Sequence, residues 1–221
     1  MYSLKKAGFS IQLDDVNPFS SWFSYGSNLS ALDFESKMRA YYSNLTLLSP
    51  LKCTLKSTCD GKRVERKLDN RSSKRGLAYA LHELPTGEEE PVVGIIHDVP
   101  IADICAFLRF EGVLDESYQV MPKGDWQDFN GKRTYDIKRV VVTIEDAPNR
   151  HDLNCLALFG SLQVPEDKRE QEILKRDKYE SEVVYVLTAM KGAADFEIDT
   201  LPFEKDLSRV KTWGKKTASS R

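Results

Sequence analysis

A glutamate among apolar residues is the first residue whose type and place could support chemistry. Glu111 follows Phe107, Leu108 and Phe110 and directly precedes Gly112. If Glu111 lies at the core-facing edge of a sheet, burial would raise its pKa from roughly 4.3, and its carboxylate could accept a proton near neutral pH. The alternative is a glutamate at a helix end that points to solvent. Taken by itself, Glu111 favours this second interpretation.

A loop near the N-terminus could bind a ligand through its backbone. The aromatic run that begins at Trp22 stops on Tyr25-Gly26-Ser27-Asn28. Gly and Asn both tolerate left-handed backbone angles, so a strand that ends in an ordinary tight turn explains this segment. A loop whose amides face a ligand explains it as well. Taken by itself, the segment favours the ordinary turn.

Three further patterns offer no catalytic site. Residues 124–131 have six residues between two glycines, where a phosphate-binding P-loop has four, so they predict a polar surface loop. Residues 60–75 carry seven basic and three acidic side chains. This pattern is typical of a flexible solvated hairpin, and contact with an anionic partner is the alternative. The chain has no G-x-S-x-G elbow of a serine hydrolase.

The cysteines and histidines predict no metal site. No two cysteines form a C-x-x-C pair, and two of the four lie in apolar runs, so buried free thiols are expected. The histidines are scattered and make no H-E-x-x-H pattern. The residues concerned are Cys53, Cys59, Cys105, Cys155, His82, His97 and His151.

The composition predicts a globular protein that binds neither nucleic acid nor membrane. The chain of 221 residues is long enough for one sizeable domain, and its 41% hydrophobic and 30% charged residues are typical of folded proteins. A net charge of -2 argues against a general polyanion binder. No apolar run approaches the ~18 residues of a membrane span. The first residues lack the apolar stretch of a signal peptide, so a cytoplasmic location is expected.

The elements that would position these residues are strands and helices in irregular order. The apolar runs at 76–84 and 91–99 are bracketed by Gly, Pro and an acidic loop, which predicts a hairpin. Ser30 predicts a helix start at which it is the N-cap and Asp33 its capping partner. Gly112 predicts the end of a helix, and Pro165 predicts the start of another. The charged side chains of 166–182 are expected to face solvent. The expected strands are 20–25, 51–57, 76–84, 91–99, 139–144 and 154–162, and the expected helices are 30–45, 101–112 and 165–194.

The order of these elements predicts the fold class. It is not the regular βαβ alternation of a doubly wound fold. We therefore expect an α+β fold in which a mixed, mainly antiparallel sheet curls into a β-barrel with α-helices around it. Residues 1–18 are expected to form an N-terminal extension, 19–205 the domain, and 206–221 a C-terminal tail that is frayed from residue 211 on.

Three segments together resemble the γ-glutamylcyclotransferase family. They are Tyr25-Gly26-Ser27-Asn28-Leu29, then Glu111-Gly112-Val113 about 80 residues later, and Tyr185 seven residues before Gly192-Ala193. The resemblance covers roughly residues 20–205. It favours a ligand-binding loop at Tyr25–Leu29 over an ordinary turn, and a catalytic role for Glu111 over a position in solvent. Many members of that family have an Arg-x-Pro pattern after the first helix. This chain differs from them, because it has Arg39 there but no proline two residues later.

The resemblance implies a β-barrel-centred α+β fold with a pocket over the loop, and an activity that needs neither metal nor organic cofactor. Family members convert a γ-glutamyl compound into 5-oxoproline and release an amine or amino acid. Glu111 would be the general base and would return its proton to the leaving amine. The implied substrate-binding residues are Tyr25, Gly26, Ser27, Asn28, Leu29 and Tyr185, together with a further tyrosine that is either Tyr118 or Tyr135.

The residue types agree with that chemistry. An α-ammonium group must lose a proton before it attacks its own γ-carbonyl, and closing the ring is intramolecular. The loop amides can stabilise the charge that develops on the carbonyl oxygen. The expected partner is therefore a small γ-glutamyl molecule, and the protein could form a homodimer. Three alternatives stay open: a non-catalytic binding or regulatory module, a biosynthetic enzyme acting on γ-glutamyl groups of a specialised metabolite, and a different acyl or amide chemistry in the same pocket.

Overall fold

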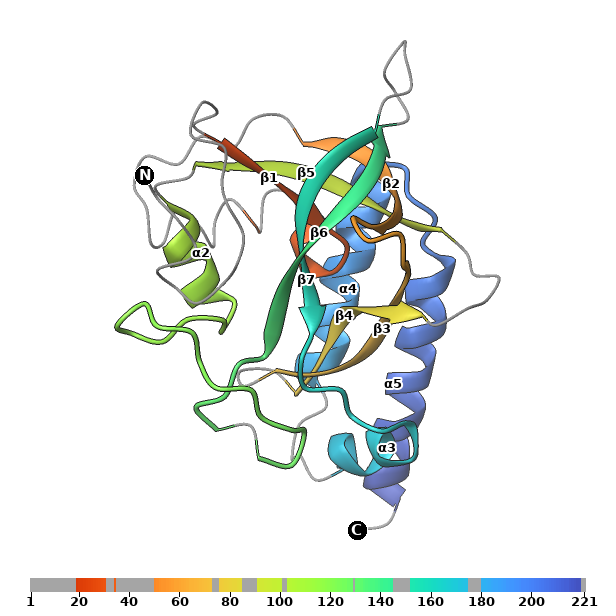
Figure 1. The fold of residues 1–221 in the computed structure, drawn as a ribbon. Helices are drawn as coiled ribbons and strands as arrows, with labels where there is room; N and C mark the ends of the chain where they lie inside the picture. Colours follow the sequence, from red (N-terminus) through yellow and green to blue (C-terminus); the bar gives the residue numbers. More distant parts are fainter. Residues whose placement is uncertain are drawn as a thin grey trace.

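A seven-stranded mixed sheet forms the centre of the protein (Figure 1). The computed structural model describes residues 19–30, 34, 50–72, 76–84, 91–100, 103–128, 130–144, 152–174 and 180–219. The strands are β1 (Phe19–Ser24), β2 (Leu51–Thr58), β3 (Arg63–Ser72), β4 (Gly76–Leu84), β5 (Val92–Pro100), β6 (Tyr135–Ile144) and β7 (Asp152–Gly160). The helices are the short 3-10 helix η2 (Ser27–Leu29), α2 (Ile104–Phe110), α3 (Glu166–Leu174), α4 (Glu180–Asp195) and α5 (Leu201–Ser219).

Five of the strands close into a barrel. The strand order is β1-β5-β2-β6-β7-β4-β3, and β1 also pairs with β7, which joins the two ends of the five-stranded part. The β1–β7 pairing is parallel and places Trp22 beside Leu156, whereas the other pairings inside the barrel are antiparallel. The predicted α+β fold, with a mixed and mainly antiparallel β-barrel and surrounding helices, is confirmed.

The helices divide the core into two clusters. Figure 1 shows α4 and α5 side by side on one side of the barrel, where they pack against each other, and α2 on another side. The larger cluster joins the barrel to α4 and α5 and includes Tyr79, Tyr185 and Phe203. The smaller cluster joins the barrel to α2 and includes Trp22 and Phe107. Strands β1, β4, β5, β6 and β7 contribute side chains to both clusters, so the barrel separates the two.

The predicted strands are all present, but one predicted pairing is wrong. Strands β4 and β5 do not form a hairpin. Instead, β4 pairs antiparallel with β3 and has a short parallel contact with β7, whereas β5 pairs with β1 and β2. Local turn residues predicted the hairpin, but they do not determine the pairing: β4 pairs with the preceding strand β3, and β5 pairs with the more distant strands β1 and β2.

The basic segment 60–75 was expected to be a flexible solvated hairpin. Its residues 63–72 form strand β3, which pairs antiparallel with the next strand, β4, so the hairpin is present. It is only partly solvated, because Val64 and Leu68 are buried against the core. A register shift between Leu68 and Asn70 marks a β-bulge, and both Asp69 and Asn70 are fully buried there. A bulge lets two consecutive residues leave the usual alternation between faces.

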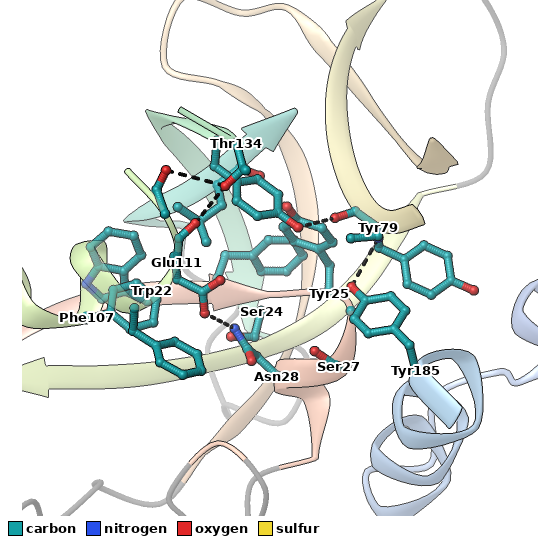
Figure 2. A pocket seen from close by; sticks show the side chains of 17 residues that line it. Trp22, Ser24, Tyr25, Ser27, Asn28, Tyr79, Phe107, Glu111, Thr134 and Tyr185 are labelled. Carbon is teal, nitrogen blue, oxygen red and sulfur yellow. Dashed lines mark hydrogen bonds between the residues drawn. The ribbon is translucent and has the colours of Figure 1, made fainter. Parts of the chain in front are cut away.

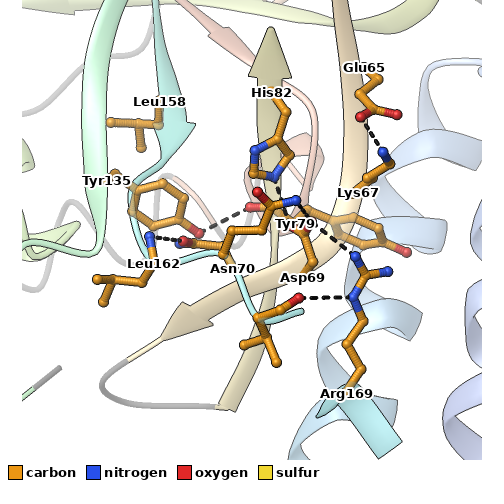
Figure 3. A network of polar contacts seen from close by, with 12 residues as sticks. Glu65, Lys67, Asp69, Asn70, Tyr79, His82, Tyr135, Leu158, Leu162 and Arg169 are labelled. Atoms are coloured by element: carbon orange, nitrogen blue, oxygen red, sulfur yellow. Dashed lines mark hydrogen bonds and ion pairs between the residues drawn. The ribbon is translucent and has the colours of Figure 1, made fainter. Parts of the chain in front are cut away.

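Polar contacts explain why the bulge can be buried (Figure 3). The Asp69 carboxylate accepts hydrogen bonds from His82 Nε2 at 2.7 Å, Gln163 Nε2 at 3.1 Å and Arg169 Nη2 at 3.3 Å. Asn70 donates from Nδ2 to a backbone oxygen and accepts from the Leu162 N–H at 3.0 Å. Buried polar groups with such partners are stable, and those without them are costly.

The helical prediction for the C-terminal part needs two corrections. Residues 165–194 were expected to be one helical region, and the structure has two helices, α3 and α4, in which Arg169 and Glu182 are buried rather than solvated. The segment 211–221 was expected to be frayed, whereas α5 runs from Leu201 to Ser219 and buries Val210.

Several sequence predictions fall outside the described residues. They concern the extension 1–18, most of the helix at 30–45 with Asp33 and Arg39, and His151. Two residues of that helix are described: the Phe34 N–H donates to the Ser30 carbonyl at 2.8 Å, as expected if Ser30 is an N-cap.

Candidate active site

A small pocket lies where the two core clusters meet (Figure 2). Its cavity volume is about 80 Å³. Strand β1 and the loop after it, β4, the end of α2, the start of β6, β7 and α4 all contribute to its wall. The lining residues are Trp22, Phe23, Ser24, Tyr25, Gly26, Ser27, Asn28, Ala78, Tyr79, Phe107, Phe110, Glu111, Gly112, Thr134, Tyr135, Leu158 and Tyr185.

The loop after β1 is a tight turn that faces this pocket. The Leu29 N–H donates to the Gly26 carbonyl at 2.9 Å, and the Ser30 N–H donates to the Ser27 carbonyl at 3.3 Å. The N–H groups of Gly26, Ser27 and Asn28 donate to no acceptor within the described part of the chain. Leu29 does not line the pocket but is fully buried in the core beside it.

Gly26 is required by a close approach of side chains. A Cβ atom at this position would lie 3.0 Å from Tyr185 Oη and 3.2 Å from Tyr79 Cβ. Contacts of this length are tighter than ordinary van der Waals contact, so an alanine would push the two tyrosines away. The absence of a side chain at Gly26 therefore makes room for two tyrosines of the pocket wall.

Two side chains from neighbouring strands anchor the ends of the loop. Arg66 on β3 donates from Nη1 to the Tyr25 carbonyl at 3.3 Å. His97 on β5 donates from Nε2 to the Asn28 carbonyl at 3.0 Å, since a carbonyl can only accept. The His97 ring also stacks on Phe34, with ring centroids 4.5 Å apart. The loop is therefore held from both sides.

The buried state of His97 leads to a prediction on pH. Burial lowers the pKa of His97 to about 4, below its ordinary value of 6.5. Because the unfolded chain binds the proton more tightly, the stability from neutral His97 is fully present above pH 6.5 and is lost as the pH falls towards 4. We expect this residue to lower the free energy of unfolding by about 3 kcal/mol between pH 7 and pH 4.

Urea unfolding at both pH values measures this effect. In His97→Gln, the Gln amide can still donate to the Asn28 carbonyl but does not titrate, so the variant should lose less stability at pH 4 than the wild type. An equal loss in both proteins would contradict the role assigned to His97.

Glu111 is the C-cap residue directly after α2, where a Schellman motif ends the helix. The Val113 N–H donates to the Leu108 carbonyl at 2.9 Å, and the Gly112 N–H donates to the Arg109 carbonyl at 3.1 Å. Gly112 has a φ of +72°, which a glycine adopts without steric cost. The predicted helix end at Gly112 is confirmed. The motif directs the chain so that Glu111 lines the pocket.

The Glu111 carboxylate contacts the loop directly. Asn28 Nδ2 donates to Glu111 Oε1 at 3.1 Å, and Figure 2 shows the two side chains pointing towards each other. Thr134 holds the backbone of Glu111 in place, since its Oγ1 donates to the Glu111 carbonyl at 2.9 Å. Thr134 is itself fixed by Asn70, whose Nδ2 donates to the Thr134 carbonyl at 2.8 Å. Asn70 of the bulge in β3 thus fixes Thr134, which in turn fixes the backbone of Glu111.

Tyrosines form the rest of the polar wall. Tyr185 Oη accepts the Tyr79 N–H at 3.1 Å, and Tyr135 Oη donates to the Tyr79 carbonyl at 3.1 Å. Tyr25 Oη donates to the Leu158 carbonyl. Burial raises the pKa of Tyr25 and of Tyr135 well above the usual value, and the nearby Tyr185 and Glu111 raise it further. Tyr25 and Tyr135 therefore stay protonated near neutral pH.

The two tyrosines that the sequence left as alternatives are now distinguished. Tyr135 is buried and lines the pocket. Tyr118 does not line it: its side chain is 45% exposed, at a positive φ of 59°, and its ring lies 5.8 Å from the Arg109 guanidinium. The structure therefore brings Tyr135, and not Tyr118, to this pocket.

Sequence reasoning missed Tyr79 and Thr134. Tyr79 lies in a strand that was predicted, and no local signal distinguishes it from the other apolar residues of that strand. Thr134 directly precedes Tyr135, and its role depends on the approach of α2 to the start of β6. The sequence carries no signal for Thr134, because its closeness to Gly112, where a Cβ atom would lie 2.7 Å from Thr134 Oγ1, arises only in the folded chain.

The charge of the pocket is negative. Among the described lining residues, Glu111 is the one side chain with a formal charge, and the others are aromatic, aliphatic or neutral polar. Such a site favours a small ligand that carries a cationic group near Glu111 and acceptor oxygens near the loop and the hydroxyls. No group of three or more His, Cys, Asp or Glu side chains within the described ranges could hold a metal ion.

The cysteines and the helices give two further results. All four cysteines are free; Cys53 and Cys155 are buried as expected, Cys105 is half-buried, and Cys59 is exposed. Of the helices in the described part of the chain, none is both long and apolar enough to cross a membrane.

Comparisons with protein-family models, with curated proteins and with solved structures found no match to this chain. Its function must therefore be argued from the pocket itself.

Proposed function

We propose that the protein is a γ-glutamylcyclotransferase. One observation carries this proposal: the Asn28 Nδ2–Glu111 Oε1 contact of 3.1 Å joins the loop and the carboxylate in one small pocket, although they are 83 positions apart in the chain. Neither segment favoured a functional role alone. Their contact supports a site in which the loop holds a substrate against the Glu111 carboxylate, which accepts a proton from it.

Glu111 would act first as the base. The α-ammonium group of a bound γ-glutamyl compound gives a proton to the Glu111 carboxylate, and the free amine attacks the γ-carbonyl carbon. A new C–N bond closes the five-membered ring, and the negative charge moves to the carbonyl oxygen. This intermediate collapses when the C–N bond to the leaving amine breaks. Over the whole reaction the α-nitrogen loses two protons and the leaving nitrogen gains two, so no water is consumed.

The loop and the tyrosines would supply the remaining interactions. The N–H groups of Gly26, Ser27 and Asn28, which have no described acceptor, are suited to a carboxylate or to the developing oxyanion. A rigid turn that holds the glutamyl chain folded lowers the entropic part of the barrier. Since the cavity of about 80 Å³ admits only a small group, the leaving amine would extend towards solvent.

The proposal is tested by incubating the purified protein with a panel of γ-glutamyl amino acids and γ-glutamyl amines. Mass spectrometry then measures 5-oxoproline against a heat-inactivated control, because some γ-glutamyl compounds cyclise without an enzyme. Release from at least one member supports the proposal, and the absence of release from all of them contradicts it.

Tyr135→Phe and Tyr118→Phe form a matched pair. Tyr135→Phe removes the donor to the Tyr79 carbonyl in the pocket wall, so we expect a stability loss of about 1–3 kcal/mol and slower formation of 5-oxoproline. Tyr118→Phe removes a hydroxyl from a surface loop and should change neither quantity. Thermal unfolding and steady-state rates measure both. Equal effects of the two variants would contradict the placement of Tyr135 in the working site.

A further inference from the structure

Arg66 is a cation that donates a hydrogen bond to a backbone oxygen of the loop after β1. It lies on β3 and is half-buried, with Nη1 donating to the Tyr25 carbonyl at 3.3 Å. Its guanidinium carbon lies 3.8 Å from the ring centroid of Phe203 and 5.4 Å from that of Tyr79. It forms no ion pair with a carboxylate in the described ranges. Burial lowers the pKa of Arg66, but a guanidinium stays charged.

The Tyr25 carbonyl and the Gly26 N–H belong to one peptide group. A donor that binds the carbonyl oxygen draws electron density through the peptide bond and makes the N–H a stronger donor. Gly26 is buried and lines the pocket, yet its N–H donates to no acceptor within the described residues. Buried N–H groups without a protein partner are rare, and a ligand or water normally satisfies them.

We propose that Arg66 is a positioning residue that polarises the Tyr25–Gly26 peptide, so that the Gly26 N–H stabilises the oxyanion formed from the substrate. The inference rests on the proposed function for the identity of that anion. Arg66 does not line the pocket and would not touch the substrate. Its charge acts through one peptide group, which also fixes the direction of the Gly26 N–H.

Arg66 can be reached from a second hollow of the surface. It lines a groove of about 500 Å³ between β3, β5 and the segment before α5, together with Lys67, Val93 and Ile198. Because this groove is open to solvent, a small cation could enter the space that truncation of Arg66 leaves. The pocket and its substrate would not obstruct that route.

The first test is the amide signal of Gly26 in the ligand-free, ¹⁵N-labelled full-length protein. In Arg66→Met the Gly26 nitrogen signal should move upfield, because the carbonyl loses its cationic donor. In Arg66→Lys, which keeps a cation over the rings, the shift should be smaller. Lys67→Met is the matched control, since Lys67 is the next residue of β3 and pairs with Glu65 instead. A Gly26 signal that stays at the wild-type position in folded Arg66→Met and Arg66→Lys would overturn the inference.

The second test is kinetic. We expect Arg66→Ala to lower kcat about tenfold with little change in KM, which is less than the loss on removing an oxyanion donor outright. Millimolar guanidinium should restore part of kcat in Arg66→Ala and have no such effect on Lys67→Ala. A rise in KM with unchanged kcat would overturn the inference, because it would assign Arg66 to ground-state binding.

The two tests separate the inference from the proposed function. If the wild type forms no 5-oxoproline, the proposed function fails, while the Gly26 signal still decides whether Arg66 polarises the loop. If the wild type is active and the Gly26 signal does not respond to Arg66, only the inference fails.

Discussion

Glu111→Gln is expected to reduce the formation of 5-oxoproline by at least about 10²–10⁴-fold, the range by which general acid–base catalysis accelerates reactions. The amide has nearly the shape of the carboxylate and can still accept the hydrogen bond from Asn28 Nδ2, so the pocket should keep its form. It cannot accept the proton of the α-ammonium group. The loss should therefore appear in kcat with little change in stability.

The matched control for this substitution is Glu116→Gln. Glu116 is five residues further along the chain, and its side chain is 94% exposed. The same chemical change there should leave the rate within error of the wild type. If Glu111→Gln retains most of the wild-type rate, Glu111 is not the base, and the reaction scheme proposed above is wrong.

Gly192→Ala is expected to displace α4 from the ligand loop. A Cβ atom at Gly192 would lie 2.2 Å from the Ser30 nitrogen and 2.4 Å from the Leu29 carbonyl carbon, and backbone atoms cannot rotate away from it. Alanine favours a helix over glycine by about 1 kcal/mol. The clash should outweigh this gain, with a net stability loss of about 1–3 kcal/mol.

The same displacement should reduce activity. Tyr185 lies two turns earlier in α4, and its hydroxyl accepts the Tyr79 N–H in the pocket wall. A shift of about 1 Å in a positioned group can cost about 10²-fold in rate. Ala194→Ser also adds one heavy atom, but at an exposed position of the same helix, and should have neither effect. Chemical unfolding and steady-state kinetics measure both quantities, and a Gly192→Ala protein as stable and as active as Ala194→Ser would contradict the close helix–loop contact.

Local chemistry made part of the site predictable from the sequence. The glycine of the loop and the Glu111-Gly112 helix end are short-range signals, because a tight turn and a Schellman motif depend on a few neighbouring residues. The strands were found from their apolar periodicity. These signals sufficed for the strands and the fold class, whereas the loop and the carboxylate were singled out by the resemblance to the γ-glutamylcyclotransferase family.

The remaining parts depend on pairing between distant segments. Arg66 reaches the loop because β3 pairs with β4 beyond the barrel, whereas the charge pattern of the segment suggested that its basic side chains face solvent. Asp69 and Asn70 became buried through a bulge, which has no clear sequence signature. The choice between Tyr118 and Tyr135 depended on the path of a surface loop. The apolar periodicity of a strand or helix predicts which of its faces is buried. It does not predict which other strand or helix packs against that face.

The central claim is that the Tyr25–Asn28 loop holds a γ-glutamyl group so that its own amine, rather than water, attacks the γ-carbonyl. The most direct measurement is the product formed in H₂¹⁸O from the best substrate of the panel. Ring closure predicts 5-oxoproline without ¹⁸O, because the γ-carbonyl oxygen is retained and no water is consumed. Glutamate that carries one ¹⁸O would contradict the claim, because it would show that water cleaves the amide in this pocket.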